Sequence, residues 1–222
     1  MADDAQQTAS SAASSGVSFD VDYPGPMDRM TTFFRLIWAI PIMILLGLLT
    51  NAGVVHYSEA AGKAATSSGG ITAGLFVATA LMLVFRRRYP RWWFDFGVEL
   101  ARFSARVGAY LFLLTDRYPS TTDAQSVHLE VTYPDAEQLH RWLPLVKWLL
   151  AIPHYIVLAF LSIGALVVTI IAWFAILFTG IYPRSLFDFT VGVGRWSARV
   201  WAYAFLLVTD EYPPFSLRPR LR

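Results

Sequence analysis

One uninterrupted apolar stretch, WLLAIPHYIVLAFLSIGALVVTIIAWFAILFTGIYP at residues 148–183, decides the fold class. It holds 36 residues without Asp, Glu, Lys or Arg. A single helix of that length would be ~54 Å long, whereas ~20 residues are enough to cross the ~30 Å hydrocarbon core of a bilayer. We therefore expect two membrane-spanning helices, at about residues 143–161 and 164–181, joined by a tight turn near Ser162-Ile163-Gly164.

The first half of the chain carries two further apolar stretches. Residues 36–55 contain no charge and are interrupted only by Pro41, which is expected to kink a helix near its cytoplasmic end. A shorter stretch at 71–85 ends at three consecutive arginines. The sequence therefore predicts an all-α integral membrane protein with four transmembrane helices arranged as two hairpins.

The composition excludes several classes of function. Of the 222 residues, 55% are hydrophobic and 15% are charged, whereas ~25% charged is usual in soluble domains. Eight Trp and ten Tyr supply side chains that anchor at the level of lipid headgroups. A net charge of +2 argues against a nucleic-acid partner. Because there is no Cys, disulfides, thiolate metal sites and cysteine nucleophiles are excluded.

The basic residues predict the orientation in the membrane. Of the 18 Lys and Arg, only Lys63 falls in a loop between two paired spans. Positive charge marks the cytoplasmic side, so we expect a multi-pass protein with both termini in the cytoplasm. Residues 1–16 are small, polar and acidic, and they lack the features of a signal peptide. They are predicted to form a disordered tail.

The sequence also repeats itself, because three motifs of the first half return in the same order in the second half. This predicts two tandem units in one orientation, repeat 1 at residues 17–119 and repeat 2 at residues 127–216. The matching segments are VSFDVDYP (17–24) and VHLEVTYP (127–134), YPRWWFDF (89–96) and YPRSLFDF (182–189), and RFSARVGAY (102–110) and RWSARVWAY (195–203).

The spacing between the copies shows where they differ. The offset is 112 residues between Pro41 and Pro153, but only 93 between Tyr89 and Tyr182. The first copy therefore holds 19 extra residues between its two spans, close to the length of residues 51–70. This difference favours a turn in the middle of the long apolar stretch of the second copy.

Each predicted unit begins with a short segment in which apolar and polar residues alternate, at residues 17–23 and 127–133. Period-two alternation indicates a β-strand. We expect the two strands to form a small cytoplasmic sheet over the helix ends. The alternative is an edge strand that pairs with a partner protein.

Each unit ends with an amphipathic segment, at about residues 92–114 and 186–208. Its charged residues fall on one stripe at helical spacing, while aromatic and aliphatic residues cover the rest. A helix lying in the cytoplasmic membrane interface fits this pattern, because a membrane crossing would bury the charges. The stripes consist of Asp95, Glu99, Arg102 and Arg106 in the first unit and Asp188, Arg195 and Arg199 in the second.

In both stripes an aspartate precedes an arginine by two helical turns. We expect structural ion pairs between Asp95 and Arg102 and between Asp188 and Arg195. A proton relay through the two aspartates is the alternative.

The second half of the chain resembles a known family. IPHYIVLAFL (152–161) and WFAILFTGIYPRSLFDFTVGVGRWSARVWAYAFLLVTDEYPPF (173–215) are similar to an uncharacterised prokaryotic membrane family named domain of unknown function 4389. The resemblance covers nearly all of residues 127–216, and residues 17–119 are a looser match. It implies a membrane fold in the prokaryotic cytoplasmic (inner) membrane, but no established activity, catalytic residue or cofactor.

Chemistry-bearing residues are few. His154 alone among the four histidines lies in an apolar span, where it is either a metal or haem ligand or a hydrogen-bonded structural residue. The basic run at 86–91 is either a stop-transfer signal or a site for anionic lipid headgroups. The candidate lipid or interface residues are Arg86, Arg87, Arg88, Arg91, Trp92, Trp93, Arg102, Arg106, Arg184, Arg195 and Arg199.

No catalytic constellation occurs in the sequence, since it lacks a Walker loop, a GxSxG elbow and an HExxH motif. We therefore expect a non-enzymatic membrane accessory or scaffold protein that acts in a larger complex. A small oligomeric transporter or channel and an anionic-lipid-binding protein are the alternatives. The expected partners are membrane lipids, anionic ones above all, together with further copies of the chain or another membrane protein.

Overall fold

The computed structural model describes residues 16–50, 55–57, 64–66, 71–120, 123, 125–135, 139–140 and 142–219. The predicted tail, apart from Gly16, and most of the predicted loop at 51–70 lie outside these residues. In chain order, the first half contains β1 (Val17–Val21), α2 (Arg29–Thr50), β2 (Val55–Tyr57), β3 (Ala64–Thr66), α3 (Ile71–Arg86) and α4 (Arg91–Leu111).

The second half has a similar order of elements but one helix in place of a hairpin. It contains β4 (Val127–Val131), the 3-10 turn η1 (Leu143–Leu145), α5 (Lys147–Leu150), α6 (Ile152–Thr179), α7 (Arg184–Trp201) and the π-helical turn η2 (Ala202–Leu206).

The predicted turn near Ser162-Ile163-Gly164 is wrong, because α6 runs through it as one helix of 28 residues. A single internal glycine costs only ~1 kcal/mol relative to alanine, which does not break a long apolar helix. The helix ends instead at Gly180, whose φ of 75° gives the left-handed cap that favours glycine. The second half lacks the 19 extra residues of the first half. Its two apolar segments are therefore continuous in one helix and are not joined by a shorter loop.

Two helices among the described residues are long and apolar enough to cross a membrane, α2 and α6. The predicted first span corresponds to α2, which begins at Arg29 and continues through Pro41. The predicted second span corresponds to α3, a shorter apolar helix. The separate spans predicted at 143–161 and 164–181 are replaced by η1, α5 and the single helix α6.

The two predicted strands are present and pair with each other. β1 and β4 form an antiparallel ribbon in which Phe19 lies opposite Leu129. Asp22 N donates to Ser126 O across the ribbon, so the neighbouring odd-numbered residues of β1 form the non-hydrogen-bonded pairs. The outward carbonyls of Phe19 and Leu129 are therefore left for partners outside the ribbon.

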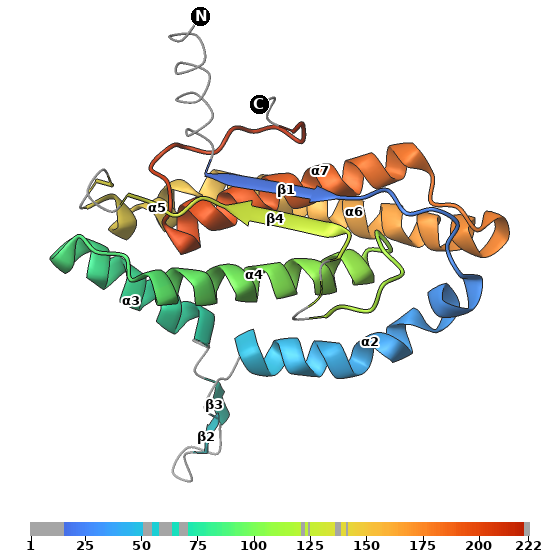
Figure 1. The fold of residues 1–222 in the computed structure, drawn as a ribbon, viewed down its shortest axis with the longest axis horizontal. Helices are drawn as coiled ribbons and strands as arrows, with labels where there is room; N and C mark the ends of the chain where they lie inside the picture. The colour runs from blue at the N-terminus through green and yellow to red at the C-terminus, as the bar shows by residue number, and fades with distance from the viewer. Residues whose placement is uncertain are drawn as a thin grey trace, which may run out of the picture.

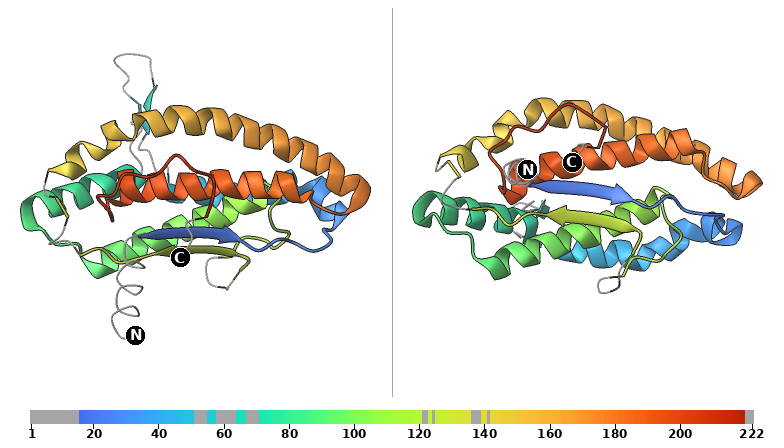
Figure 2. Two further views of the ribbon diagram at one scale, coloured as in Figure 1. Left: turned by 90° about the horizontal axis from the view of Figure 1, so that it is seen from above. Right: turned by 45° about the horizontal axis from the view of Figure 1, so that its top comes forward.

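The elements form layers along the long axis of the molecule (Figure 1). The ribbon lies over α4 and α7, and each strand packs on the helix of the other half, β1 on α7 and β4 on α4. Helix α6 packs along α7 on the side away from the ribbon, and α2 packs against α4 and α6. In Figure 2, α6 extends along most of the length of the molecule with α7 beside it, and the shorter ribbon lies along the central part.

Apolar clusters join the α4 and α7 regions at both ends. At one end, Leu113 and Leu114, just beyond α4, pack with Ile176 of α6 and Val191 of α7. At the other end, Phe94 and Val98 of α4 pack with η2 and the residues that follow it. Between these clusters the two helices are bridged by the ribbon rather than by direct packing.

The ribbon approaches α7 closely at Gly194. A Cβ atom on Gly194 would lie 2.6 Å from Cε1 of Phe19, which is shorter than any real contact. Gly108 of α4 is half-buried, and a Cβ atom there would meet nothing within 4 Å. Gly194 therefore permits a close contact between α7 and the ribbon, whereas Gly108 borders open space.

These two glycines allow a matched test of the packing. Gly194→Ala should lower the free energy of unfolding by about 1–3 kcal/mol, because the methyl group overpacks against Phe19. Gly108→Ala should leave it unchanged or raise it by up to about 1 kcal/mol, because alanine favours a helix and meets no clash. Thermal unfolding in detergent measures both variants, and equal shifts in the two would contradict the arrangement of the ribbon.

Candidate functional site

Two arginines attach the ribbon to the helices beneath it. Arg102 of α4 donates from Nε to the carbonyl oxygen of Leu129 at 2.9 Å, and from Nη1 to Glu99 at 2.5 Å. Arg195 of α7 donates from Nε to the carbonyl oxygen of Phe19 at 3.2 Å, and from Nη2 to Asp20 at 2.6 Å. Each arginine therefore holds the strand contributed by the other half of the chain.

These contacts correct the predicted ion pairs. Asp95 and Asp188 are exposed and, among the described residues, pair with neither arginine. A separation of two helical turns is ~10 Å along the axis, whereas the strand carbonyls lie directly above the arginines. On each edge of the ribbon, the carbonyl at the middle of the strand accepts a hydrogen bond from one of these arginines. A strand of a partner protein therefore cannot pair with that carbonyl.

A second pair of predicted lipid-contacting arginines instead covers tyrosine rings. The guanidinium of Arg91 lies 5.2 Å from the ring centre of Tyr133, and that of Arg184 lies 3.9 Å from the ring centre of Tyr23. The hydroxyl of Tyr133 donates to the carbonyl of Tyr89. These contacts fix the chain just beyond each strand to the start of α4 or α7.

Tyr89 itself is anchored in the core between the two halves. Its hydroxyl donates to the carbonyl of Leu206 at 3.0 Å, and burial raises the pKa of this phenol well above its ordinary value. The loop between α3 and α4 is thereby tied to η2.

Two buried cations were not recognised in the sequence as structural residues. Arg35 of α2 donates to the carbonyls of Tyr110 and Thr115, both at 2.9 Å, and pairs with Asp116. Lys147 of α5 is fully buried, and its Nζ lies 2.7 Å from both the Thr209 carbonyl and Asp210 Oδ1. Burial lowers the pKa of Lys147, and the neighbouring Asp210 partly offsets this effect.

An apolar cavity of about 470 Å³ lies under the ribbon, between α4 and α7. Its roof is formed by Phe19 and Leu129, and its walls are mostly glycine, alanine and serine. The wall residues are Leu100, Ala101, Ser104, Ala105, Gly108, Ala109, Phe112 and Leu114 from α4 and the residues after it, Thr190, Val193, Gly194, Ser197, Ala198 and Trp201 from α7, and Thr50, Ser162 and Ala165 from α2 and α6. We name this space the central cavity.

The central cavity has little capacity for polar recognition. Of the five hydroxyl groups on its walls, those of Thr50, Ser104 and Thr190 each donate to the carbonyl four residues earlier in their own helix. No group of three or more His, Asp or Glu residues that could hold a metal occurs among the described residues. The cavity therefore suits a hydrocarbon ligand rather than a charged substrate.

The cavity opens on the side away from the ribbon. Ser104 and Ala105 of α4 and Ala198 of α7 line the cavity and are only half-buried. Helices α2 and α6 meet where the indole of Trp173 donates to the carbonyl of Thr32 at 3.1 Å, near the start of α2. Ser162, which lines the cavity, is exposed. The exposed Ser162, with Thr50 and Ala165 beside it in the lining, therefore brings the cavity to the protein surface between the end of α2 and the middle of α6.

His154 does not lie in the cavity. The indole of Trp196 donates to its Nδ1 at 3.1 Å, and the imidazole stacks on Phe215 with ring centres 4.0 Å apart. Its Nε2 is buried and has no hydrogen-bond partner among the described residues. His154 is thus surrounded by aromatic rings, and it belongs to no group of three or more His, Asp or Glu residues in the described part of the chain.

The remaining predicted interface residues fall into two sets. Arg106 and Arg199 donate to the carbonyls of Ser120 and Ser216, so both tie down the segment that follows their helix. Trp93 donates from its indole to Thr79 at 2.8 Å and is half-buried. The exposed set consists of Arg86, Arg87, Arg88 and Trp92.

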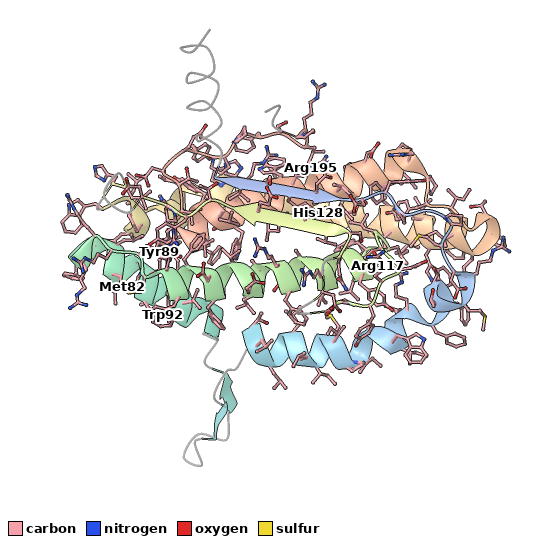
Figure 3. The ribbon with its side chains drawn as sticks, in the orientation of Figure 1. Met82, Tyr89, Trp92, Arg117, His128 and Arg195 are labelled. Atoms are coloured by element: carbon pink, nitrogen blue, oxygen red, sulfur yellow. The ribbon has the colours of Figure 1, made fainter. Side chains whose placement is uncertain are left out.

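The exposed set lies at one corner of the molecule, where α3 meets α4. Figure 3 shows Met82, Tyr89 and Trp92 at this corner, away from Arg195 and His128 at the ribbon. A surface depression here is lined by Met82, Arg86, Arg87, Arg88, Tyr89, Pro90, Tyr133, Pro134 and Asp135.

Comparison with known proteins agrees with the resemblance inferred from the sequence. Residues 142–216, 75 of the 222, match the family described as Domain of unknown function (DUF4389). The second half of the chain resembles that family. The match contains α5, α6, α7 and η2, whereas the looser likeness of residues 17–119 stays a prediction. No curated protein and no protein of known structure matches the chain.

Removal of one carboxylate tests the buried pair of Lys147 and Asp210. Asp210→Asn should lower the free energy of unfolding by about 3 kcal/mol, because it leaves a buried ammonium without its counter-charge. Thermal unfolding in detergent measures the loss, and Asp188→Asn, at an exposed carboxylate of α7, is the control.

The same variant should respond to pH. The pKa of Lys147 is already lowered by burial, and loss of Asp210 lowers it further. Between the folded pKa and the ordinary value of 10.5, the unfolded state binds a proton that the folded state does not. The stability of Asp210→Asn should therefore rise with pH toward 10.5, and a deficit that is constant from pH 7 to 10 would contradict this assignment.

Proposed function

We propose that the chain is a non-enzymatic membrane accessory or scaffold protein of the prokaryotic cytoplasmic membrane, with its charged ribbon in water and α6 lying in the membrane plane. The observation that carries the proposal is the exposed face of α2 and α6. Only 22% of the most apolar 18-residue window of each helix is buried, so neither is a core helix of the folded chain. Apolar surface of this extent marks a membrane or protein contact.

The ribbon supports an in-plane orientation of α6. Helix α7 packs against α6, β1 packs against α7, and Figure 2 shows the charged ribbon running alongside the apolar helix. Asp20 and Asp22 are 61% and 67% exposed. If α6 crossed the bilayer, these carboxylates would lie at the depth of the hydrocarbon core, at a cost of several kcal/mol each. With α6 in the plane, they stay in water.

The distribution of basic residues supports the same orientation. A single crossing by α6 would place Arg184, Arg195 and Arg199 on the outer side, against the positive-inside rule. A return crossing by α7 would restore them, but it would carry the same arginines and Asp188 through the bilayer. An α6 that stays within the cytoplasmic leaflet avoids both costs and keeps the C-terminal region in the cytoplasm.

We also infer that the two halves are tandem copies of one unit. Equivalent residues make equivalent contacts: Arg102 and Arg195 each bond a strand carbonyl, and Arg35 and Lys147 each pair with the aspartate of a TD dipeptide. Leu113 and Leu207, 94 residues apart in the corresponding FLL segments, share a left-handed backbone with φ of 63° and 59°. These matched details support a duplication in which the strand of each copy packs on the helix of the other copy.

Spin labels along α6 test the orientation, and the absence of cysteine makes single-cysteine variants straightforward. We expect labels at the exposed positions Ile156, Phe160, Ile163, Ile170 and Phe174 to report one shallow depth in reconstituted vesicles. A label at Asp22 on the ribbon should remain in water. A depth that rises to a maximum near Ile163 and falls again toward Phe174 would show a crossing helix and overturn the in-plane proposal.

A second candidate function, binding of anionic lipid headgroups, is favoured by the corner formed by Arg86, Arg87 and Arg88. Three adjacent exposed guanidinium groups border the surface depression, beside the exposed indole of Trp92. Basic residues near a membrane attract anionic lipid by about 1 kcal/mol each.

Charge removal tests this second function. Changing Arg86, Arg87 and Arg88 together to Gln should reduce the anionic share of co-purifying phospholipid, because up to about 3 kcal/mol of attraction is lost. Mass spectrometry of the bound lipids measures that share. A triple variant at Arg29, Arg117 and Arg218, which are also exposed, removes the same charge elsewhere. Equal loss in both triples would show that only net charge matters.

A further inference from the structure

We infer that the central cavity binds one acyl chain of a membrane lipid, which enters from the bilayer between α2 and α6. The inference rests on the proposed membrane location and assigns a ligand to the cavity. Its volume of about 470 Å³ falls within the ~300–1,000 Å³ of small-molecule sites.

The first step of the argument is the chemistry of the walls. The cavity is roofed by apolar side chains of the ribbon, and three of its five hydroxyls already donate within their own helices. A charged or strongly polar ligand would lose its hydration there without gaining partners. A hydrocarbon chain that enters from the bilayer gives up no hydrogen bonds, and it exchanges one apolar environment for another while it packs against the walls.

The second step is the position of the opening. It lies beside Thr50 of α2 and Ser162 of α6, on the face where the exposed apolar residues of both helices gather. With that face in lipid, the mouth of the cavity adjoins acyl chains and not water. The adjoining lipid is therefore the first ligand available to fill the space.

The third step is that the space is built into the chain. The walls of α4 and α7 carry the Ser-Ala pairs of the two SARV motifs, Ser104-Ala105 and Ser197-Ala198. Small residues on facing helices usually bring the helices into close contact. Here α4 and α7 are joined at their ends and bridged by the ribbon, so the small residues leave a space instead.

Gly108 provides the means to close the space. A Cβ atom there meets nothing within 4 Å, so Gly108→Leu should extend a side chain into the cavity without clashing with the helices. Gly47→Leu is the matched control, because Gly47 is also a helical glycine with no atom within 4 Å of its Cβ position and it does not line the cavity.

The experiment uses the full chain in vesicles of a phospholipid with a photoreactive diazirine near the end of one acyl chain. Mass spectrometry then locates the lipid adducts on the protein. We expect two groups of adducts, one on the exposed face of α6 at residues such as Phe160 and one inside the cavity at residues such as Trp201.

Gly108→Leu should reduce the cavity adducts about tenfold and leave the α6 adducts unchanged, because the leucine side chain fills part of the space that an acyl chain would occupy. Gly47→Leu should change neither group. Ala198→Leu, on the opposite wall, repeats the test if Gly108→Leu fails to fold.

Different failures have different meanings. Adducts on α6 without any in the wild-type cavity would overturn the acyl-chain site and would support the membrane location. This result is expected if a second copy or another segment of the chain fills the cavity. Cavity adducts that persist at full yield in both leucine variants would also overturn it. A lack of adducts on α6 would instead refute the proposed function.

Discussion

The contact on which the rest of the structure depends is the bond from an arginine Nε to the central carbonyl of a strand. Arg102 and Arg195 each place it on the strand from the other half of the chain, so neither half forms its strand layer alone. Because both outward carbonyls at the middle of the ribbon are used in this way, the ribbon is fixed across α4 and α7 at one height. The same register turns Phe19 and Leu129 toward the helices and makes them the roof of the central cavity.

A bridged pair of helices differs from a packed pair in what its small residues do. Gly194 allows the ring of Phe19 to approach α7, which is a packing role, and the space at Gly108 remains open. The apolar clusters at the two ends supply the burial that would otherwise come from contact between α4 and α7. The middle of the molecule is thus free to hold a ligand without loss of the core.

Periodicity in the sequence was sufficient to predict the individual strands and helices, but it could not predict which residues of other elements they contact. Alternation at residues 17–23 and 127–133 predicted both strands, and the charged stripes predicted the helices that became α4 and α7. The spacing of Asp95 and Arg102 suggested a pair on one helix, because spacing describes only that helix; the strand carbonyl is a long-range partner. The turn at Ser162–Gly164 failed for a related reason, since Ser and Gly weaken a helix too little to end it when all neighbours are apolar. The repeated Ser-Ala pairs were visible, but only the separation of α4 and α7 distinguishes a cavity from a close helix contact.

The length of α6 also bears on how this helix is oriented in the membrane. Its 28 residues give a helix of ~42 Å, so a helix that crosses the ~30 Å core would tilt or would extend into the headgroup regions at its ends. Since α7 is packed along α6, a crossing would also draw the arginines of α7 and the ribbon toward hydrocarbon. An in-plane helix has no length to match, and it can be apolar on every side that α7 does not cover. The proposed in-plane placement therefore accounts together for the exposed hydrophobic surface of α6, the charge of α7 and the position of the cavity.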